Sequence, residues 1–256
     1  MKEETIRVKD GNLFYRFEGQ GEPLILLHSL GVSSESWQHV IEPLSRNFSV
    51  YAVDLMGHGN SDKPSKNYEI YHYAENVIEL MDVLKINQAR IIGNSIGAMV
   101  SIEMSVSFPQ RLAKQVLVGC PIWDTAWERM ERLMFYSYLR YDSDGNLEPI
   151  TMDGLSLFFA HPTTAVLDWY NNVEAKAEPW RKKAQIAIVL YDVVSKLHMV
   201  NCPTLIISGG KDELHEKDQV LVQRIKGAKY SLIEDAGHLP QMDAPEDFLK
   251  PVMEFL

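Results

Sequence analysis

The sequence predicts an α/β protein with a mostly parallel, doubly wound sheet of about eight strands and a helical insertion in the second half of the chain. Two observations support this. Short apolar runs bounded by glycine, proline, aspartate or serine alternate with segments of helical pattern, as in parallel sheets that are buried on both faces. This alternation stops near residue 121 and resumes near residue 199. Because parallel strands need crossover connections, the alternation favours helices on both sides of the sheet.

The first two strands are predicted to form a hairpin. The segment "TIRVKDGNLFYRFEG" alternates apolar and polar positions on either side of Asp10 and Gly11, which is a hairpin signal. Six further apolar runs are predicted to be buried strands: "PLILLHS", "FSVYAVDL", "ARIIGNS", "QVLVGC", "TLIISGG" and "YSLIEDA". The hairpin and these runs together give the expected eight strands.

Helices are predicted between the strands and in the insertion. Those between the strands are expected at residues 34–47, 68–85, 97–108 and 216–227. Those in the insertion are expected at residues 125–141, 154–161, 163–175 and 179–197. We therefore expect a core of residues 1–120 and 199–256 that carries a helical cap of residues 121–198. The cap is expected to cover a site, because ligand clefts in open parallel sheets lie at the carboxyl ends of the strands.

Composition narrows the classes of partner. The chain has 256 residues, 46% of them hydrophobic, and a formal net charge of -10. Nucleic-acid and anionic-membrane binding depend on clustered Lys and Arg, so small molecules are the expected partners. The N-terminus has no apolar signal region, and no apolar run approaches the length of a membrane span, so we expect a cytoplasmic protein. Cys120 and Cys202 have neither metal-site nor disulfide-framework spacing and are expected to be reduced.

A serine stands between two glycines where a strand gives way to a helix. The segment "ARIIGNSIGAMVSIEMS" is an apolar run, then Gly93-Asn-Ser95-Ile-Gly97, then a helical pattern. A serine that serves only as a helix cap, with glycines that serve only as turn residues, would explain part of this. The strand–turn–helix context favours a nucleophile instead, since such a sharp turn exposes the hydroxyl above the sheet. The amides at the start of the helix would face any anion that forms beside Ser95.

A nucleophilic serine needs a base and a carboxylate that orients the base. His238 follows the last predicted strand, and Asp212 follows the strand before it. Taken singly, Asp212 could be a helix cap and His238 a surface-loop histidine, although Asp218 is the better-placed cap. The order Ser, Asp, His, with each residue at the carboxyl end of a different strand, favours a catalytic triad of Ser95, Asp212 and His238.

Five motifs of the chain resemble those of a known superfamily of proteins. The residues that carry the resemblance are "LLHSLGVSSESW", "YAVDLMGHGNSDKP", "GNSIGAM", "PTLIISGGKDELH" and "AGHLPQMDAPEDFLKPVMEFL". They are similar to the α/β-hydrolase superfamily, and within it to the compact capped kind: non-heme haloperoxidase-like esterases, 3-oxoadipate enol-lactonases and carbon-carbon bond hydrolases. The resemblance covers residues 5–256 apart from the insertion. It implies the α/β-hydrolase fold.

The resemblance also implies an oxyanion hole made of two backbone amides, those of Leu30 and Ile96. The loop that carries Leu30 usually begins His-Gly in this superfamily, whereas this chain has serine at position 29. His28 is then expected to shape the loop through bonds to backbone rather than to act as a base. The turn that contains His58 is expected to be structural and to form part of the floor of the site.

The expected activity is that of a serine esterase or lactonase acting through an acyl-enzyme, with no metal and no organic cofactor. Its expected partner is a small apolar acyl substrate, and homo-oligomerisation stays open. Two alternatives remain. The turn "GNSIG" resembles that of carbon-carbon hydrolases of ring-fission products, although those enzymes usually place tryptophan after the catalytic histidine and this chain has Leu239. The second alternative is a small-molecule receptor that has the hydrolase fold but little turnover.

The sequence leaves the roles of two groups of side chains in the insertion undecided. Aromatic and methionine residues there could line an acyl pocket or pack as cap core: Trp123, Trp127, Met130, Met134, Phe135, Phe158, Phe159 and Trp169. Helical spacing favours packing. The cluster Arg181, Lys182 and Lys183 could bind a substrate carboxylate, but a solvated helix face is the favoured interpretation.

Overall fold

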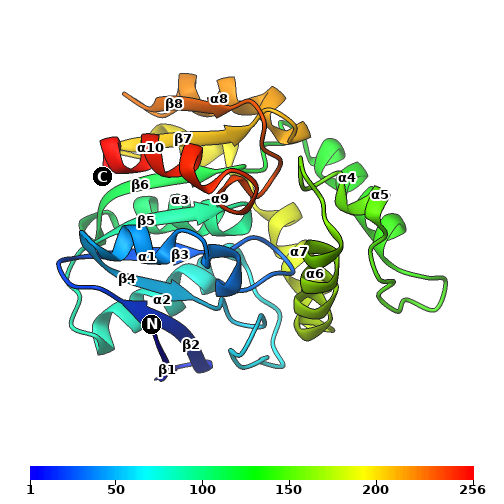
Figure 1. Cartoon of the computed structure of the whole chain (residues 1–256), viewed down its shortest axis with the longest axis horizontal. Coiled ribbons are helices and arrows are strands. Elements are labelled where there is room, and N and C mark those ends of the chain that lie inside the picture. Colours follow the sequence, from blue (N-terminus) through cyan, green and yellow to red (C-terminus); the bar gives the residue numbers. More distant parts are fainter.

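The structure is a computed structural model that describes residues 1–256, apart from the side chains of residues 133 and 136–139. Its centre is one eight-stranded sheet with the order β1-β2-β4-β3-β5-β6-β7-β8 (Figure 1). The strands are β1 Lys2–Val8, β2 Gly11–Glu18, β3 Glu22–Leu27, β4 Phe48–Val53, β5 Ala89–Asn94, β6 Leu112–Val118, β7 Thr204–Gly209 and β8 Lys229–Ile233. The β1–β2 and β2–β4 pairs are antiparallel, and the other pairs are parallel. The prediction of about eight mostly parallel strands is confirmed.

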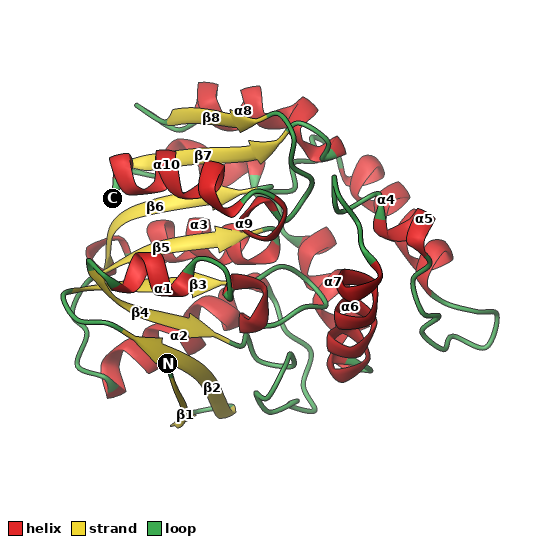
Figure 2. Ribbon diagram, in the orientation of Figure 1, coloured by secondary structure: helices red, strands yellow, loops and turns green.

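Helices cover both faces of the sheet (Figure 2). Those that pack on or beside the sheet are α1 Ile41–Ser45, α2 Ile70–Val83, α3 Ile96–Ser107, α8 Asp218–Arg224, α9 Pro240–Asp243 and α10 Pro245–Phe255. The buried residues of α2, α3 and α8 share one apolar cluster. Those of α1 and α10 share another. The sheet is therefore doubly wound, as the sequence predicts.

Strand β3 shows why its sequence is continuously apolar. Leu24 and Leu26 belong to the cluster beneath α1 and α10, whereas Ile25 and Leu27 belong to the cluster beneath α2 and α3. Successive side chains of a strand point to opposite faces, so a strand that is covered on both faces needs apolar residues at every position.

The segment between β6 and β7 is helical and lies beyond the carboxyl ends of the parallel strands (Figure 1). Its helices are α4 Ala126–Arg140, α5 Met152–Leu155, α6 Thr164–Ala177 and α7 Trp180–Leu190, followed by the 3-10 helix η3 Val194–Met199. In the backbone that the structure describes, the segment adds no strand to the sheet; its bridge between Tyr141 and Leu147 is isolated. We use the name cap for residues 121–198, and these boundaries stay a prediction.

Three helix predictions are wrong. Residues 179–197 are α-helical only as far as Leu190, because the backbone is extended at Tyr191, and the 3-10 helix η3 follows. Residues 34–47 form a 3-10 helix, η1 Ser34–Trp37, and then the short α1. The ring of Pro43 would clash with the carbonyl four residues earlier in one continuous helix. Residues 154–161 are helical only as far as Leu155, because later backbone groups of that segment bond to another loop: the Phe158 carbonyl accepts from the His238 amide at 2.8 Å.

No described helix combines the length and the apolar character that crossing a membrane requires. Both cysteines are free in the structure, and Cys120 is buried.

We expect Phe248→Ala to destabilise the fold. Phe248 is fully buried, and its ring centroid lies 6.3 Å from that of Trp37. Truncation removes a large apolar side chain and leaves a cavity, which costs about 3–5 kcal/mol of unfolding free energy. Urea denaturation measures this loss. The control is Met253→Ala on the exposed side of the same helix, with an expected change within about 0.5 kcal/mol; equal losses in both variants would contradict this account of the core.

Candidate active site

Ser95 occupies a strained corner between β5 and α3. Its φ is 57°, a left-handed value that non-glycine residues rarely adopt. Its amide is held by the Val118 carbonyl at 2.8 Å. A Cβ on Gly93 would lie 2.2 Å from the Gly97 carbonyl oxygen, and a Cβ on Gly97 would lie 2.2 Å from the Leu27 carbonyl oxygen. Close approach of β5, α3 and β3 thus requires both glycines of the motif.

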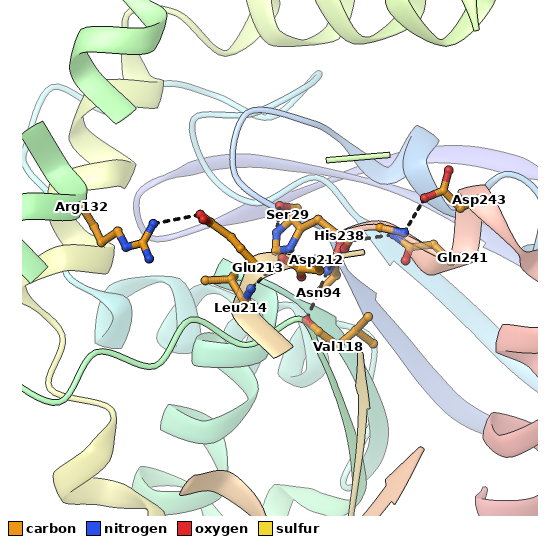
Figure 3. A network of polar contacts seen from close by, with 11 residues as sticks. Ser29, Asn94, Val118, Arg132, Asp212, Glu213, Leu214, His238, Gln241 and Asp243 are labelled. Atoms are coloured by element: carbon orange, nitrogen blue, oxygen red, sulfur yellow. Dashed lines mark hydrogen bonds and ion pairs between the residues drawn. The ribbon is translucent and has the colours of Figure 1, made fainter. Parts of the chain in front are cut away.

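His238 and Asp212 form a direct pair (Figure 3). Asp212 follows β7 and His238 follows β8, and the Nδ1 of His238 lies 2.7 Å from the Oδ2 of Asp212. The other carboxylate oxygen, Oδ1, accepts from the Leu214 amide at 3.1 Å. That second bond caps a 3-10 helix, η4 Glu213–Lys217. The cap role and the histidine-partner role, which the sequence presents as alternatives, therefore coexist in Asp212.

Opposing effects set the charges of this pair. Burial of His238 disfavours its charged form, but the attraction of Asp212 and the hydrogen bond to it outweigh burial and raise the pKa of His238 above 6.5. For Asp212, burial acts to raise the pKa, and the His238 ring overcomes it, so the pKa stays below its usual value. An ionised Asp212 fixes the proton on Nδ1 and leaves Nε2 of the neutral ring as an acceptor.

Two residues that sequence reasoning missed support this pair. The buried side-chain amide of Asn94 donates to the backbone carbonyls of Val118 at 3.2 Å and of His238 at 3.1 Å. Gly119 has a φ of 50°, and a Cβ there would lie 3.0 Å from the His238 Nδ1 and 3.1 Å from the Asp212 Oδ2. In the sequence, Asn94 stands directly before the serine and Gly119 directly after a predicted strand. Neither position indicates that the residue lies against the Asp212–His238 pair.

The loop after β3 has the geometry expected of a shaped turn. The Leu55 amide donates to Nε2 of His28 at 2.9 Å, so Nδ1 carries the proton and donates to the Ser29 carbonyl at 2.7 Å. Burial lowers the pKa of His28. His28 thus holds backbone on both sides, as expected. Leu30 lines the adjacent cavity, and Ile96 is the first residue of α3, where an amide has no acceptor within its own helix.

The turn after β4 packs beneath this loop. Asp54 accepts from the Ser34 amide at 2.7 Å and from the Asn60 amide at 2.8 Å, so both of its carboxylate oxygens hold backbone. The buried ring of His58 lies 5.1 Å from that of His28. Burial keeps the pKa of His58 well below its ordinary value. These contacts fit the expected structural role of the turn.

A cavity of about 210 Å³ lies between the sheet edge and the cap. Ser95, Asp212, His238 and Leu30 all line it, so the structure brings these predicted residues to one place. Most of the other lining residues are apolar: Val32, Pro121, Trp123, Phe135, Leu157, Phe158, Tyr170, Ile188, Val189, Leu214 and Leu239. The remaining lining residues are polar or charged: Ser29, Ser156, Arg181, Gln185, Lys211 and Glu213. The apolar lining suits the apolar part of a small substrate.

The cap aromatics and methionines divide between three environments. Trp123, Phe135 and Phe158 line the cavity. Phe159 is buried in the apolar core of the cap, and Trp169 packs partly buried against that core. The remaining three are exposed: Trp127, Met130 and Met134. The expected preference for packing therefore holds for only some members of the group.

The favoured interpretation of the basic cluster on α7 is wrong for Arg181. Arg181 is only 4% exposed and lines the cavity. Its Nε lies 2.7 Å from Oε1 of Glu174, and Arg140 pairs with the same carboxylate. Two buried guanidinium groups thus share one buried carboxylate, and the three side chains carry a net positive charge. Lys182 and Lys183 are half-buried.

The fold and this site together define a parallel α/β protein with a serine corner and an Asp–His pair under a helical cap. The chain belongs to the alpha/beta hydrolase fold family, whose model matches residues 22–245. It has the α/β-hydrolase fold.

Comparisons with individual proteins place it among distant relatives. A stretch of 105 residues is 38% identical to an uncharacterised protein of Mycobacterium tuberculosis and covers 41% of this chain, but only 31% of that relative. The match to 3-oxoadipate enol-lactonase 2 of Acinetobacter baylyi has 26% identity and covers 96% of this chain and 93% of the relative. The structure of an esterase from Exiguobacterium antarcticum superposes with a TM-score of 0.84 and 21% identity, covering 98% of each chain.

We expect Asp212→Asn to lower the pKa of His238. The wild-type imidazole should titrate above 6.5, and removal of the Asp212 charge leaves burial as the dominant effect, which favours the neutral ring. NMR titration of the imidazole resonances measures the change. Asp235→Asn, in the exposed part of the same loop, removes a carboxylate that pairs with His161 at 2.9 Å, and as the matched control it should leave the titration of His238 unchanged. An identical pKa in wild type and Asp212→Asn would contradict the electrostatic account.

Proposed function

We propose that this protein is a hydrolase that cleaves a small carboxylic ester or lactone through an acyl-enzyme on Ser95, with His238 as general base and Asp212 as the group that orients it. The 2.7 Å bond between Asp212 and His238 is the main observation in support, because it lies at a cavity that Ser95 also lines. That bond leaves Nε2 of His238 as the available base.

In the first half of the reaction, Ser95 attacks the substrate carbonyl and its proton passes to Nε2 of His238. Asp212 stabilises the imidazolium that results, in keeping with the raised pKa of His238. The amides of Leu30 and Ile96 are the proposed donors to the oxyanion. The positive end of the dipole of α3 adds to this stabilisation. Expulsion of the alcohol, which takes the proton from His238, leaves the acyl-enzyme.

In the second half, water attacks the acyl carbonyl and gives a proton to His238. Collapse of the tetrahedral intermediate breaks the bond to Ser95, which regains its proton from His238. The residues of the chain supply nucleophile, base and oxyanion donors, so the proposal invokes neither metal nor organic cofactor.

The substrate proposal goes beyond an apolar acyl group. The lining is mostly apolar, but the Arg181 guanidinium belongs to it and to a buried cluster with net positive charge. A buried cation gains most from a ligand that carries the opposite charge. We therefore propose an ester or lactone that also bears a carboxylate. The 3-oxoadipate enol-lactonase relative supports this, because its name refers to a dicarboxylate skeleton.

One residue of the chain favours ester or lactone cleavage over carbon-carbon cleavage. Leu239 lines the cavity directly after His238, where the carbon-carbon hydrolases that the sequence resembles usually have tryptophan. We also propose a cytoplasmic location without nucleic-acid or membrane partners, as the sequence predicts, and homo-oligomerisation stays open.

Ser95→Ala is expected to abolish turnover without loss of fold. Removal of the nucleophile or of its base should lower kcat by on the order of 10⁴-fold or more. A fluorophosphonate, which labels activated serines, should form a single adduct on Ser95 of the wild type and none in His238→Ala, as read by intact mass and peptide mapping. Ser107→Ala, at the far end of the same helix, is the control and should label normally. Unchanged turnover in folded Ser95→Ala protein would refute the assignment.

Arg181→Gln is expected to change substrate preference. Two 4-nitrophenyl esters serve as probes, with acyl chains of equal length that end in a carboxylate or in a methyl group. The variant should lose about 10- to 100-fold in kcat/KM for the carboxylate ester, the worth of one charge-assisted hydrogen bond, and little for the methyl ester. Glu174 retains Arg140 as its partner in this variant. Lys183→Gln on the same helix is the control, and an equal loss on both esters would contradict the proposal.

A further inference from the structure

The loop after β3, which carries Leu30, places a second hydroxyl at the proposed base. Ser29 Oγ lies 3.4 Å from Nε2 of His238, the nitrogen that the proposed mechanism uses (Figure 3). Ser29 is buried and lines the same cavity as Ser95. The mechanism described above gives this hydroxyl no role.

The contact suits both protonation states of the base. Because the Nδ1 proton of His238 faces Asp212, Nε2 of the neutral ring can only accept, so the Ser29 hydroxyl donates to it. When Nε2 holds a proton, the Ser29 oxygen can accept that proton in a hydrogen bond, since a hydroxyl has both capacities. Ser29 can therefore stay next to the base throughout a catalytic cycle.

Hydrogen bonds of His28 hold the backbone that carries this hydroxyl. The ring of His28 donates to the Ser29 carbonyl at 2.7 Å and accepts from the Leu55 amide at 2.9 Å. The loop is thereby tied to the turn after β4. Ser29 needs little reorganisation to keep its hydroxyl near His238, which is the property expected of a positioning group.

We propose that Ser29 positions the water that hydrolyses the acyl-enzyme; this inference rests on the proposed function. Once Ser95 is acylated, its oxygen has no proton to give, and Nε2 must take its proton from water. One O–H of that water then points to Nε2 of His238 and the other donates to Ser29 Oγ. The water oxygen bonds to the acyl carbon, its proton passes to His238, and the bond to Ser95 breaks as His238 returns the proton to Ser95. Ser29 is unchanged at the end.

This role is selective for the second half of the reaction. Attack by Ser95 needs no bound water, so loss of the Ser29 hydroxyl should affect deacylation far more than acylation. A hydroxyl that only kept His238 in place would affect both halves alike, because His238 serves as base in both. The two roles can therefore be separated by measuring each half-reaction.

The test compares Ser29→Ala, Ser29→Gly and Ser29→Thr with the wild type. The rate of labelling by a fluorophosphonate reports attack by Ser95. The lifetime of an acyl-enzyme formed with excess 4-nitrophenyl acetate, after removal of the ester and followed by intact mass, reports deacylation. We expect Ser29→Ala and Ser29→Gly to label within about threefold of the wild type and to deacylate about 10- to 100-fold more slowly. Ser29→Thr, which keeps a hydroxyl, should recover most of the deacylation rate.

Two results would overturn the proposal: equal slowing of labelling and deacylation, or an unchanged acyl-enzyme lifetime in Ser29→Ala. Ser29→Gly guards against a steric artefact, because the resembled family usually has glycine at this position. Failure of the proposed function looks different, because then the wild type itself takes no label on Ser95.

Discussion

The close approach of three backbone segments at Ser95 is the constraint on which the site depends. Strand β5 must end, turn and start α3 within a space where neither Gly93 nor Gly97 has room for a Cβ. The turn leaves Ser95 at a left-handed φ, with its amide held by Val118. Packing of helices against the apolar strands on both faces of the sheet supplies the stability against which this strained residue is held. The serine reaches the cavity because the corner is sharp.

The Asp212–His238 pair depends on contacts from both the sheet and the cap. Asn94, next to the serine, binds the His238 carbonyl, and the His238 amide donates to Phe158 in the cap. The carboxylate of Asp243 accepts from the Gly237 amide at 2.7 Å and from the Ala160 amide at 2.9 Å. The base is thus positioned by the same hydrogen bonds that fasten this part of the cap to the loop after β8.

The buried ion-pair cluster of Arg181, Glu174 and Arg140 connects the cap to the loop after β3. A Cβ on Gly31, one residue beyond Leu30, would lie 3.2 Å from Nε of Arg181, so the guanidinium packs directly against the loop after β3. Arg181 in turn is held by Glu174, which Arg140 shares. Burying three charged groups is costly unless they are paired. Their place beside the cavity gives the cluster a proposed use, the recognition of an anionic substrate, in addition to its contribution to cap packing.

The sequence alone determined the features that depend on local pattern. Alternating apolar runs and helical patterns predicted a mostly parallel sheet and the succession of strands and helices along the chain, and the strand–turn–helix motif marked Ser95. Chain order also brought Asp212 and His238 to one sheet edge, because parallel strands end on the same side. Tertiary structure decided the rest. The roles of Asn94 and Gly119, the burial of Arg181 and the non-helical course of residues 156–161 all depend on groups distant in the chain, and local spacing carries no information about such partners.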